Sequence, residues 1–124
     1  MYLDTDILYA TIDTNDPHAK VAQKIINMKE EKYSSIATLI ELEFVIRREL
    51  SDDASKNVLE PLRDLNLKFK EIDLKTFELS LDIRRDYDLT IMDSLHAACA
   101  LLNDKRIAST DGAYDRIIEL RRIF

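Results

Sequence analysis

The chain has 124 residues, the size of one ordinary domain. It is 46% hydrophobic and 34% charged, a balance typical of a folded protein, and its 18 basic and 24 acidic residues give 18 − 24 = −6 for the net charge. We therefore treat residues 1–124 as a single domain.

Rare residue types exclude several kinds of site. Gly112 is the one glycine, so neither a P-loop nor a glycine-rich dinucleotide loop can be built. Cys99 is the one cysteine, so an internal disulfide and a cysteine-based metal cluster are excluded. Because the N-terminus lacks a signal-peptide pattern and no apolar run reaches about 18 residues, we expect a soluble, cytoplasmic protein. What remains is the chemistry of carboxylates, hydroxyls and any metal ion that they bind.

Strand and helix signals alternate along the first half of the chain. Tyr2-Leu3 predicts a short strand that ends at Asp4. Asp16-Pro17 predicts the start of a helix over residues 16–30, because Asp caps helices and Pro favours the first helical position. A second strand is expected over residues 33–37, followed by a helix over residues 38–50.

The second half continues the alternation. Residues 51–66 predict a helix or a pair of helices divided near Pro61, and Asp73 is expected to cap a later helix. The other expected elements are strands at 67–72, 106–109 and 121–124, a largely apolar and therefore buried helix at 90–103, and a short helix at 113–120.

This alternation predicts a parallel sheet with helices on both faces. We therefore expect one three-layer α/β/α domain with a central parallel sheet of four to five strands. In such domains the ligand crevice lies beyond the carboxyl ends of the strands. That edge of the sheet is the place to look for chemistry.

Carboxylates gather where the predicted strands end. Clustered carboxylates repel one another unless a cation neutralises them, and oxygen ligands favour Mg²⁺ or Mn²⁺. Such an ion suits hydrolysis of a phosphate ester. The acids in question are Asp4, Asp6, Glu41, Asp93, Asp111 and Asp115.

Each acid also has a purely structural interpretation. Thr38-x-x-Glu41 and Thr90-x-x-Asp93 fit the capping box, and Asp111-Gly112 is a favourable turn dipeptide. Capping does not explain why the first strand also ends in an acid, or why Asp93 precedes the most buried helix. Taken together, the acids favour a metal site.

Two further side chains near these acids have alternative interpretations. His96 follows Asp93 by one helical turn and could form a ligand pair with it, but a histidine packed in the core is the favoured interpretation. Thr5 adjoins Asp4, where it could position a water molecule or only cap a helix. Cys99 is interpreted as a packed thiol.

Four segments resemble, in order and spacing, the motifs of PIN-domain ribonucleases, and most closely those of the VapC-type toxins. The resemblance covers essentially the whole chain. The segments are YLDTDIL (2–8), SIATLIELE (35–43), LTIMDSLHAACAL (89–101) and IASTDGAYDRI (107–117).

The resemblance places the family's four catalytic acids on Asp4, Glu41, Asp93 and Asp111. It implies an Mg²⁺- or Mn²⁺-dependent endonuclease that acts on single-stranded RNA, commonly as a homodimer bound by a cognate antitoxin. We expect Asp4 and Asp93 to hold the metal ion, directly or through water, and Glu41 and Asp111 to complete the site. Around them we expect a supporting role for the neighbouring polar residues Thr5, Asp6, Ser109 and Asp115.

Three positions depart from the family pattern. Asp6 stands where VapC-like members usually carry Asn, Ser109 replaces the commoner Thr, and Tyr114 takes the usual place of Phe. None of these departures removes one of the four acids. The sequence therefore predicts an active nuclease.

Two other functions and one interface are also predicted from the sequence. A haloacid-dehalogenase-like phosphatase with Asp4 as nucleophile fits Asp4-Thr5-Asp6, although Ile7-Leu8 replaces the Gly-Thr that normally follows. A PIN-like domain that only binds proteins is the third hypothesis. For the homodimer, the helices predicted at 16–30 and 38–50 are the expected interface.

Overall fold

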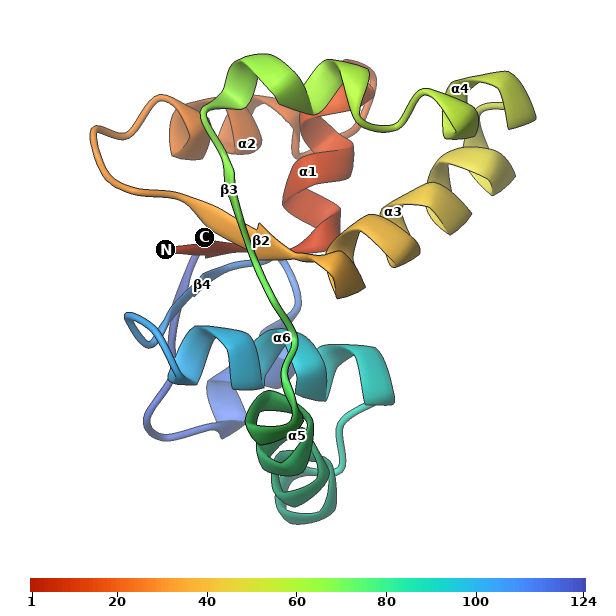
Figure 1. Ribbon diagram of the computed structural model, residues 1–124. Helices are drawn as coiled ribbons and strands as arrows, with labels where there is room; N and C mark the ends of the chain where they lie inside the picture. Colours follow the sequence, from red (N-terminus) through yellow and green to blue (C-terminus); the bar gives the residue numbers. More distant parts are fainter.

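Five parallel strands form the central sheet, in the order β3-β2-β1-β4-β5, in a computed structural model that describes all of residues 1–124 (Figure 1). The predicted parallel sheet is confirmed, with five strands. Their bounds are β1 Tyr2–Leu3, β2 Tyr33–Ser35, β3 Lys68–Lys70, β4 Arg106–Ala108 and β5 Arg121–Ile123.

Helices cover both faces of the sheet, so the predicted three-layer arrangement is confirmed. Figure 1 shows α1, α2 and the short η1 above the sheet, and α5 and α6 below it. The α-helices are α1 Thr5–Ile12, α2 Ala19–Ile26, α3 Ile36–Glu49, α4 Asp52–Lys56, α5 Leu74–Tyr87 and α6 Ile91–Leu101, and the 3-10 helices are η1 Glu60–Leu65 and η2 Gly112–Arg116. No helix is long and apolar enough to cross a membrane.

The sheet separates two hydrophobic cores, and the central strands send alternate residues into each. Tyr2 and Ile107 join the core formed with α5 and α6, whereas Leu3 and Ala108 join the core formed with α1, α2 and α3. Successive side chains of a strand point to opposite faces. Since all four side chains are buried, β1 and β4 are fixed on both sides.

Helix α1 was not among the predicted elements. Only a strand ending at Asp4 was predicted here, but Asp4 is the N-cap of a helix that follows β1 directly. Ile7 and Leu8 of this helix are fully buried. Tertiary packing therefore makes a helix of a segment whose local sequence also suits a turn.

The start of the helix predicted at residues 16–30 was wrong. Asp16 does not cap a helix, because its Oδ1 accepts the backbone N–H of His18 at 2.7 Å and so closes a turn. Helix α2 begins only at Ala19 and ends at Ile26, short of the predicted residue 30. Pro17 consequently lies in the turn and not at the first helical position.

Other boundaries differ by a few residues. Strand β2 ends at Ser35, and α3 therefore starts two residues before the predicted Thr38. The predicted segment 51–66 is a pair of short helices, α4 and η1, with Pro61 in the first turn of η1. The helix expected at 113–120 is the single-turn 3-10 helix η2.

The close packing around α6 can be tested by enlarging one alanine. Ala98 is completely buried in the core below the sheet, so Ala98→Leu should lower the free energy of unfolding by about 1–3 kcal/mol through overpacking. Urea denaturation measures this loss. The control Ala19→Leu, at the partly exposed start of α2, should change stability by less than about 0.5 kcal/mol. Equal losses in both variants would contradict the tight packing.

Candidate metal centre

Asp4 lies at the junction of β1 and α1. Its backbone N–H still donates to the carbonyl of Ala108 in β4, at 3.1 Å, and its Oδ1 accepts the N–H of Thr5 at 2.7 Å as the cap of α1. The residue is only 6% exposed. Burial raises the pKa of this carboxyl to about 6, against the opposing effect of His96 and with a further increase from Asp6.

Glu41 approaches Asp4 from α3. The early start of this helix places Glu41 in its second turn, so the Thr38-x-x-Glu41 capping box is not formed, and the N-cap is Ser35. The Glu41 side chain is 31% exposed and its Oε2 lies 3.6 Å from His96 Nε2. The nearby His96 imidazole lowers the Glu41 pKa, more than burial raises it.

His96 completes this group from α6. The side chain is completely buried, as expected for a core histidine, but its Nε2 lies 3.6 Å from Asp4 Oδ1 as well as from Glu41 Oε2. Burial alone would lower the His96 pKa, yet the carboxylates of Glu41, Asp4 and Asp93 raise it overall. Ligand atoms of Asp4, Glu41 and His96 all lie within 4.8 Å of one another.

His96 was not among the site residues predicted from the sequence. The Asp93-x-x-His96 spacing was the available signal, because residues three apart on a helix lie on one face. The spacing could not show that the ring points at Asp4 and Glu41, which belong to other elements.

Asp93 lies in the first turn of α6, next to this group. Thr90 is the N-cap and accepts the Asp93 N–H at 3.1 Å, while the Thr90 hydroxyl donates to Asp93 Oδ2 at 2.6 Å. The capping interaction is therefore formed at this position. Asp93 Oδ1 also accepts the hydroxyl of Tyr114 at 3.4 Å. The pKa of this buried tyrosine is raised first by burial and then by the charges of Asp4 and Asp93, so both acids lie near Tyr114.

Asp111 and Asp115 lie on the β4 side of the site, outside the Asp4–Glu41–His96 group. Asp111 caps η2, where its Oδ1 accepts the N–H of Ala113 at 2.8 Å. Asp115 forms a two-contact ion pair with Arg122, at 2.9 and 2.7 Å. Arg122 in turn donates to the carbonyl of Ser109 at 3.3 Å.

Asp6 and Ser109 connect α1 with the loop after β4. Asp6 Oδ2 accepts the backbone N–H of Thr110 at 2.6 Å, and Ser109 Oγ lies 3.4 Å from the same oxygen. Ser109 Oγ also accepts the Asp111 N–H at 3.0 Å, and its hydroxyl lowers the Asp4 pKa. Asp6 and Ser109 thus hold the loop that carries Asp111 against the start of α1, next to Asp4.

An open groove of about 500 Å³ lies beside the group, between α1 and α3. Its lining carries five carboxylates against two residues of basic type, His18 and Arg48; the carboxylates are those of Asp6, Asp13, Asp16, Glu41 and Glu49. A larger cavity of about 640 Å³ lies at the opposite edge of the sheet, where residues 26–32 and 64–68 precede β2 and β3. We assign the function to the groove, because only the groove adjoins the clustered acids.

The whole chain matches one protein family. Residues 1–120 match the family model of the PIN domain. The chain belongs to the PIN domain family. No curated protein is significantly similar to this PIN domain in sequence.

Solved structures share the fold of this PIN domain at low sequence identity. The toxin VapC20 of Mycobacterium tuberculosis, which cleaves the sarcin–ricin loop, has a TM-score of 0.80 at 13% identity over 93% of this chain and 92% of its own. DNA-bound VapBC of Salmonella typhimurium has a TM-score of 0.75 at 20% identity over 98% and 95%. A toxin–antitoxin complex from Klebsiella pneumoniae gives 0.71 at 18% over 99% and 95%. The family match disfavours the dehalogenase-like phosphatase.

The residues of this PIN domain fit a divalent cation. Asp4 is a buried acid whose pKa is raised, and His96 Nε2 is a buried polar atom without a hydrogen-bond partner. The first observation describes a site where negative charge is poorly compensated, and the second leaves a buried polar atom facing the carboxylates. A cation beside Asp4 would offset the negative charge.

The raised pKa of Asp4 predicts that removal of its negative charge stabilises the metal-free protein. The folded chain keeps Asp4 protonated up to about pH 6, whereas unfolded Asp loses its proton near about pH 4. Stability should therefore fall as pH rises between these values. Asp4→Asn should remove this loss and raise the free energy of unfolding at neutral pH by on the order of 1–2 kcal/mol, measured by urea denaturation with a chelator present.

Asp73→Asn is the matched control. Asp73 also caps a helix, but it is exposed, and a hydrogen bond from Thr76 lowers its pKa. This substitution should give no gain in stability at neutral pH. Equal gains in both variants would show that burial of Asp4 is not the cause.

Proposed function

We propose that this PIN domain is a metal-dependent endoribonuclease that cleaves single-stranded RNA as the toxin of a VapBC-type toxin–antitoxin pair. The observation that carries the proposal is the convergence of Asp4, Glu41 and His96 within 4.8 Å at the carboxyl edge of the sheet of a PIN domain. Ligands bind at this edge in parallel α/β domains. The oxygen-rich donor set favours Mg²⁺ or Mn²⁺.

In the proposed mechanism Asp4 and Asp93 hold the ion. When bound, the ion supplies positive charge for the phosphodiester and lowers the pKa of a water molecule. Glu41 is half-exposed at the mouth of the groove, so its carboxylate is the group that orients the attacking water for in-line attack. Asp111 completes the acidic edge on the β4 side.

An antitoxin is the proposed protein partner. The Klebsiella pneumoniae structure is that of a toxin–antitoxin complex, and the fold of the two chains is the same. The groove beside the site carries five carboxylates, so it suits a cationic segment of a protein. A small DNA-binding protein encoded directly upstream would support this pairing. The cytoplasmic location expected from the sequence remains a prediction.

We also propose that the chain forms a homodimer. The predicted interface included α3, and the exposed side chains of Ile36, Ile40 and Phe44 form an apolar row along this helix. Helix α2, the other predicted part, has no large exposed apolar side chain. A second apolar row, of Leu74, Phe77 and Leu81, lies on α5. Figure 1 shows the edge strand β3 running toward α5 past the start of α3. Exposed apolar rows beside an open sheet edge favour association with a second copy.

The nuclease proposal predicts that Asp4 is indispensable for RNA cleavage. Asp4→Asn keeps the size and the helix cap but removes one charge, so it should reduce cleavage of single-stranded RNA by at least about a hundredfold. Chelation of Mg²⁺ or Mn²⁺ should abolish cleavage by the wild type. The assay compares both proteins with each ion and with chelator.

Asp73→Asn serves as the control, because Asp73 is an exposed helix cap outside the acidic site. It should retain cleavage within a few-fold of the wild type. Cleavage that survives both the chelator and Asp4→Asn would contradict the proposal. A wild type that neither cleaves RNA nor binds Mn²⁺ would favour the protein-binding hypothesis.

The dimer proposal predicts that charge on α3 separates the two copies. Ile40 is 51% exposed in the apolar row, so Ile40→Glu should give a monomer by light scattering at micromolar concentration. Ile118 is 92% exposed but lies outside both rows, so Ile118→Glu should leave the dimer intact. A monomeric wild type would contradict the proposal.

A further inference from the structure

His96 Nε2 is an unusual atom in this core. It is buried and has no hydrogen-bond partner, although it lies 3.6 Å from one oxygen of Asp4 and one of Glu41. An unpaired buried polar atom costs about 1–3 kcal/mol, so such atoms are rare in folded proteins. The ring is therefore held where it is by the contacts on its other side.

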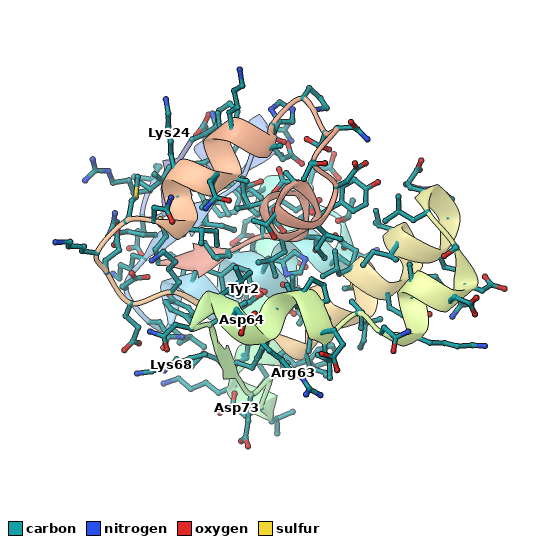
Figure 2. All side chains as sticks on the ribbon, turned by 90° about the horizontal axis from the view of Figure 1, so that it is seen from above. Tyr2, Lys24, Arg63, Asp64, Lys68 and Asp73 are labelled. Carbon is teal, nitrogen blue, oxygen red and sulfur yellow. The ribbon has the colours of Figure 1, made fainter.

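Those contacts are made by Tyr2. Its Oη lies 2.8 Å from His96 Nδ1, 2.7 Å from Thr38 Oγ1 and 2.8 Å from Ser35 Oγ. All of these side chains are buried, and the Tyr2 and His96 rings pack with their centroids 5.6 Å apart. Figure 2 shows Tyr2 near the middle of the molecule, whereas Lys68 and Asp73 lie toward its rim.

One arrangement of the hydrogens satisfies both this network and the two carboxylates that face Nε2. If the Ser35 and Thr38 hydroxyls donate to the Tyr2 oxygen, the Tyr2 hydroxyl is free to donate to His96 Nδ1. Nδ1 is then an acceptor, and the ring proton of neutral His96 must lie on Nε2. An N–H directed at two carboxylates is attractive, whereas a bare nitrogen lone pair in that place would be repelled by both.

We propose that His96 is a positioning residue, whose Nε2–H points between Asp4 and Glu41 and sets the separation of their carboxylates. The proposal deepens the proposed nuclease function and rests on the same site. It joins four elements: Asp4 follows β1, Glu41 lies on α3, His96 lies on α6, and Tyr2 of β1 holds the ring. A cation held at Asp4, and the water oriented by Glu41, would thus meet carboxylate oxygens already placed by the imidazole.

The first test removes one hydroxyl. Tyr2→Phe keeps the packed ring but deletes the hydrogen bond to Nδ1, so the Mn²⁺ dissociation constant measured by calorimetry should rise by about tenfold or more. Tyr33→Phe is the matched control, because Tyr33 is equally buried and packs 5.8 Å from the Tyr2 ring, yet its hydroxyl donates to Asp104. The control should bind Mn²⁺ as the wild type does.

Urea denaturation of both variants separates positioning from stability. Tyr2→Phe loses three buried hydrogen bonds and Tyr33→Phe loses one that is partly buried, so Tyr2→Phe should lose more stability. Both variants should still be fully folded without urea, so an unfolded fraction cannot explain a change of Mn²⁺ affinity. An equal change of Mn²⁺ affinity in the two variants, or no change in Tyr2→Phe, would overturn the proposal.

The second test observes the proton. The chain has two histidines, so nitrogen NMR of the wild type and of His18→Gln assigns the ring signals of His96. We expect a proton on Nε2 with and without Mg²⁺. Loss of this proton when Mg²⁺ binds would identify His96 as a metal ligand and overturn the positioning role.

Replacement of His96 itself gives a third, independent comparison. His96→Gln retains an amide donor, whereas His96→Leu has none, so Mn²⁺ binding should be weakened less in His96→Gln. Equal Mn²⁺ affinities in two folded variants would contradict the proposal. These measurements use the metal alone, so they test the role of His96 even if the protein does not cleave RNA.

Discussion

The site depends on one electrostatic constraint: the buried carboxylate of Asp4 is held close to the carboxylate of Glu41. Asp4 is 6% exposed, and its pKa is raised to about 6 by burial, against the opposing effect of His96. Glu41 faces the same imidazole, which lowers the Glu41 pKa. Such an arrangement favours neutralisation by a cation, by a proton or by a positive side chain, and this electrostatic cost supports the proposed cation site.

The sequence predicted the parts of the structure that periodicity and chain order determine. The alternation of strands and helices, the parallel sheet and the buried character of α6 follow from hydrophobic patterns that tertiary packing then satisfies. The acids that follow β1 and β4 were predicted to lie at one edge of the sheet, because the carboxyl ends of parallel strands share that edge. Asp73 was correctly predicted as a cap, since its signal is wholly local.

The sequence did not predict the features that depend on contacts between distant segments. Helix α1 follows β1 without a loop, and its place is fixed by Ile7 and Leu8 in the upper core. The Asp16-Pro17 signal failed because the Asp side chain closes a turn equally well. His96 was identified as buried, but its direction depends on Tyr2, which lies 94 residues earlier in the chain.

Strand β1 connects the two cores with the site through three consecutive residues. Tyr2 points into the lower core and holds His96, Leu3 points into the upper core, and Asp4 ends the strand at the site. Because β1 is paired with β2 and β4 on either side, it cannot shift without breaking both ladders. The position of the Asp4 carboxylate is consequently set by the packing of both helix layers. A substitution deep in either core, with no contact to the acids, can therefore change the geometry of the acidic group around Asp4.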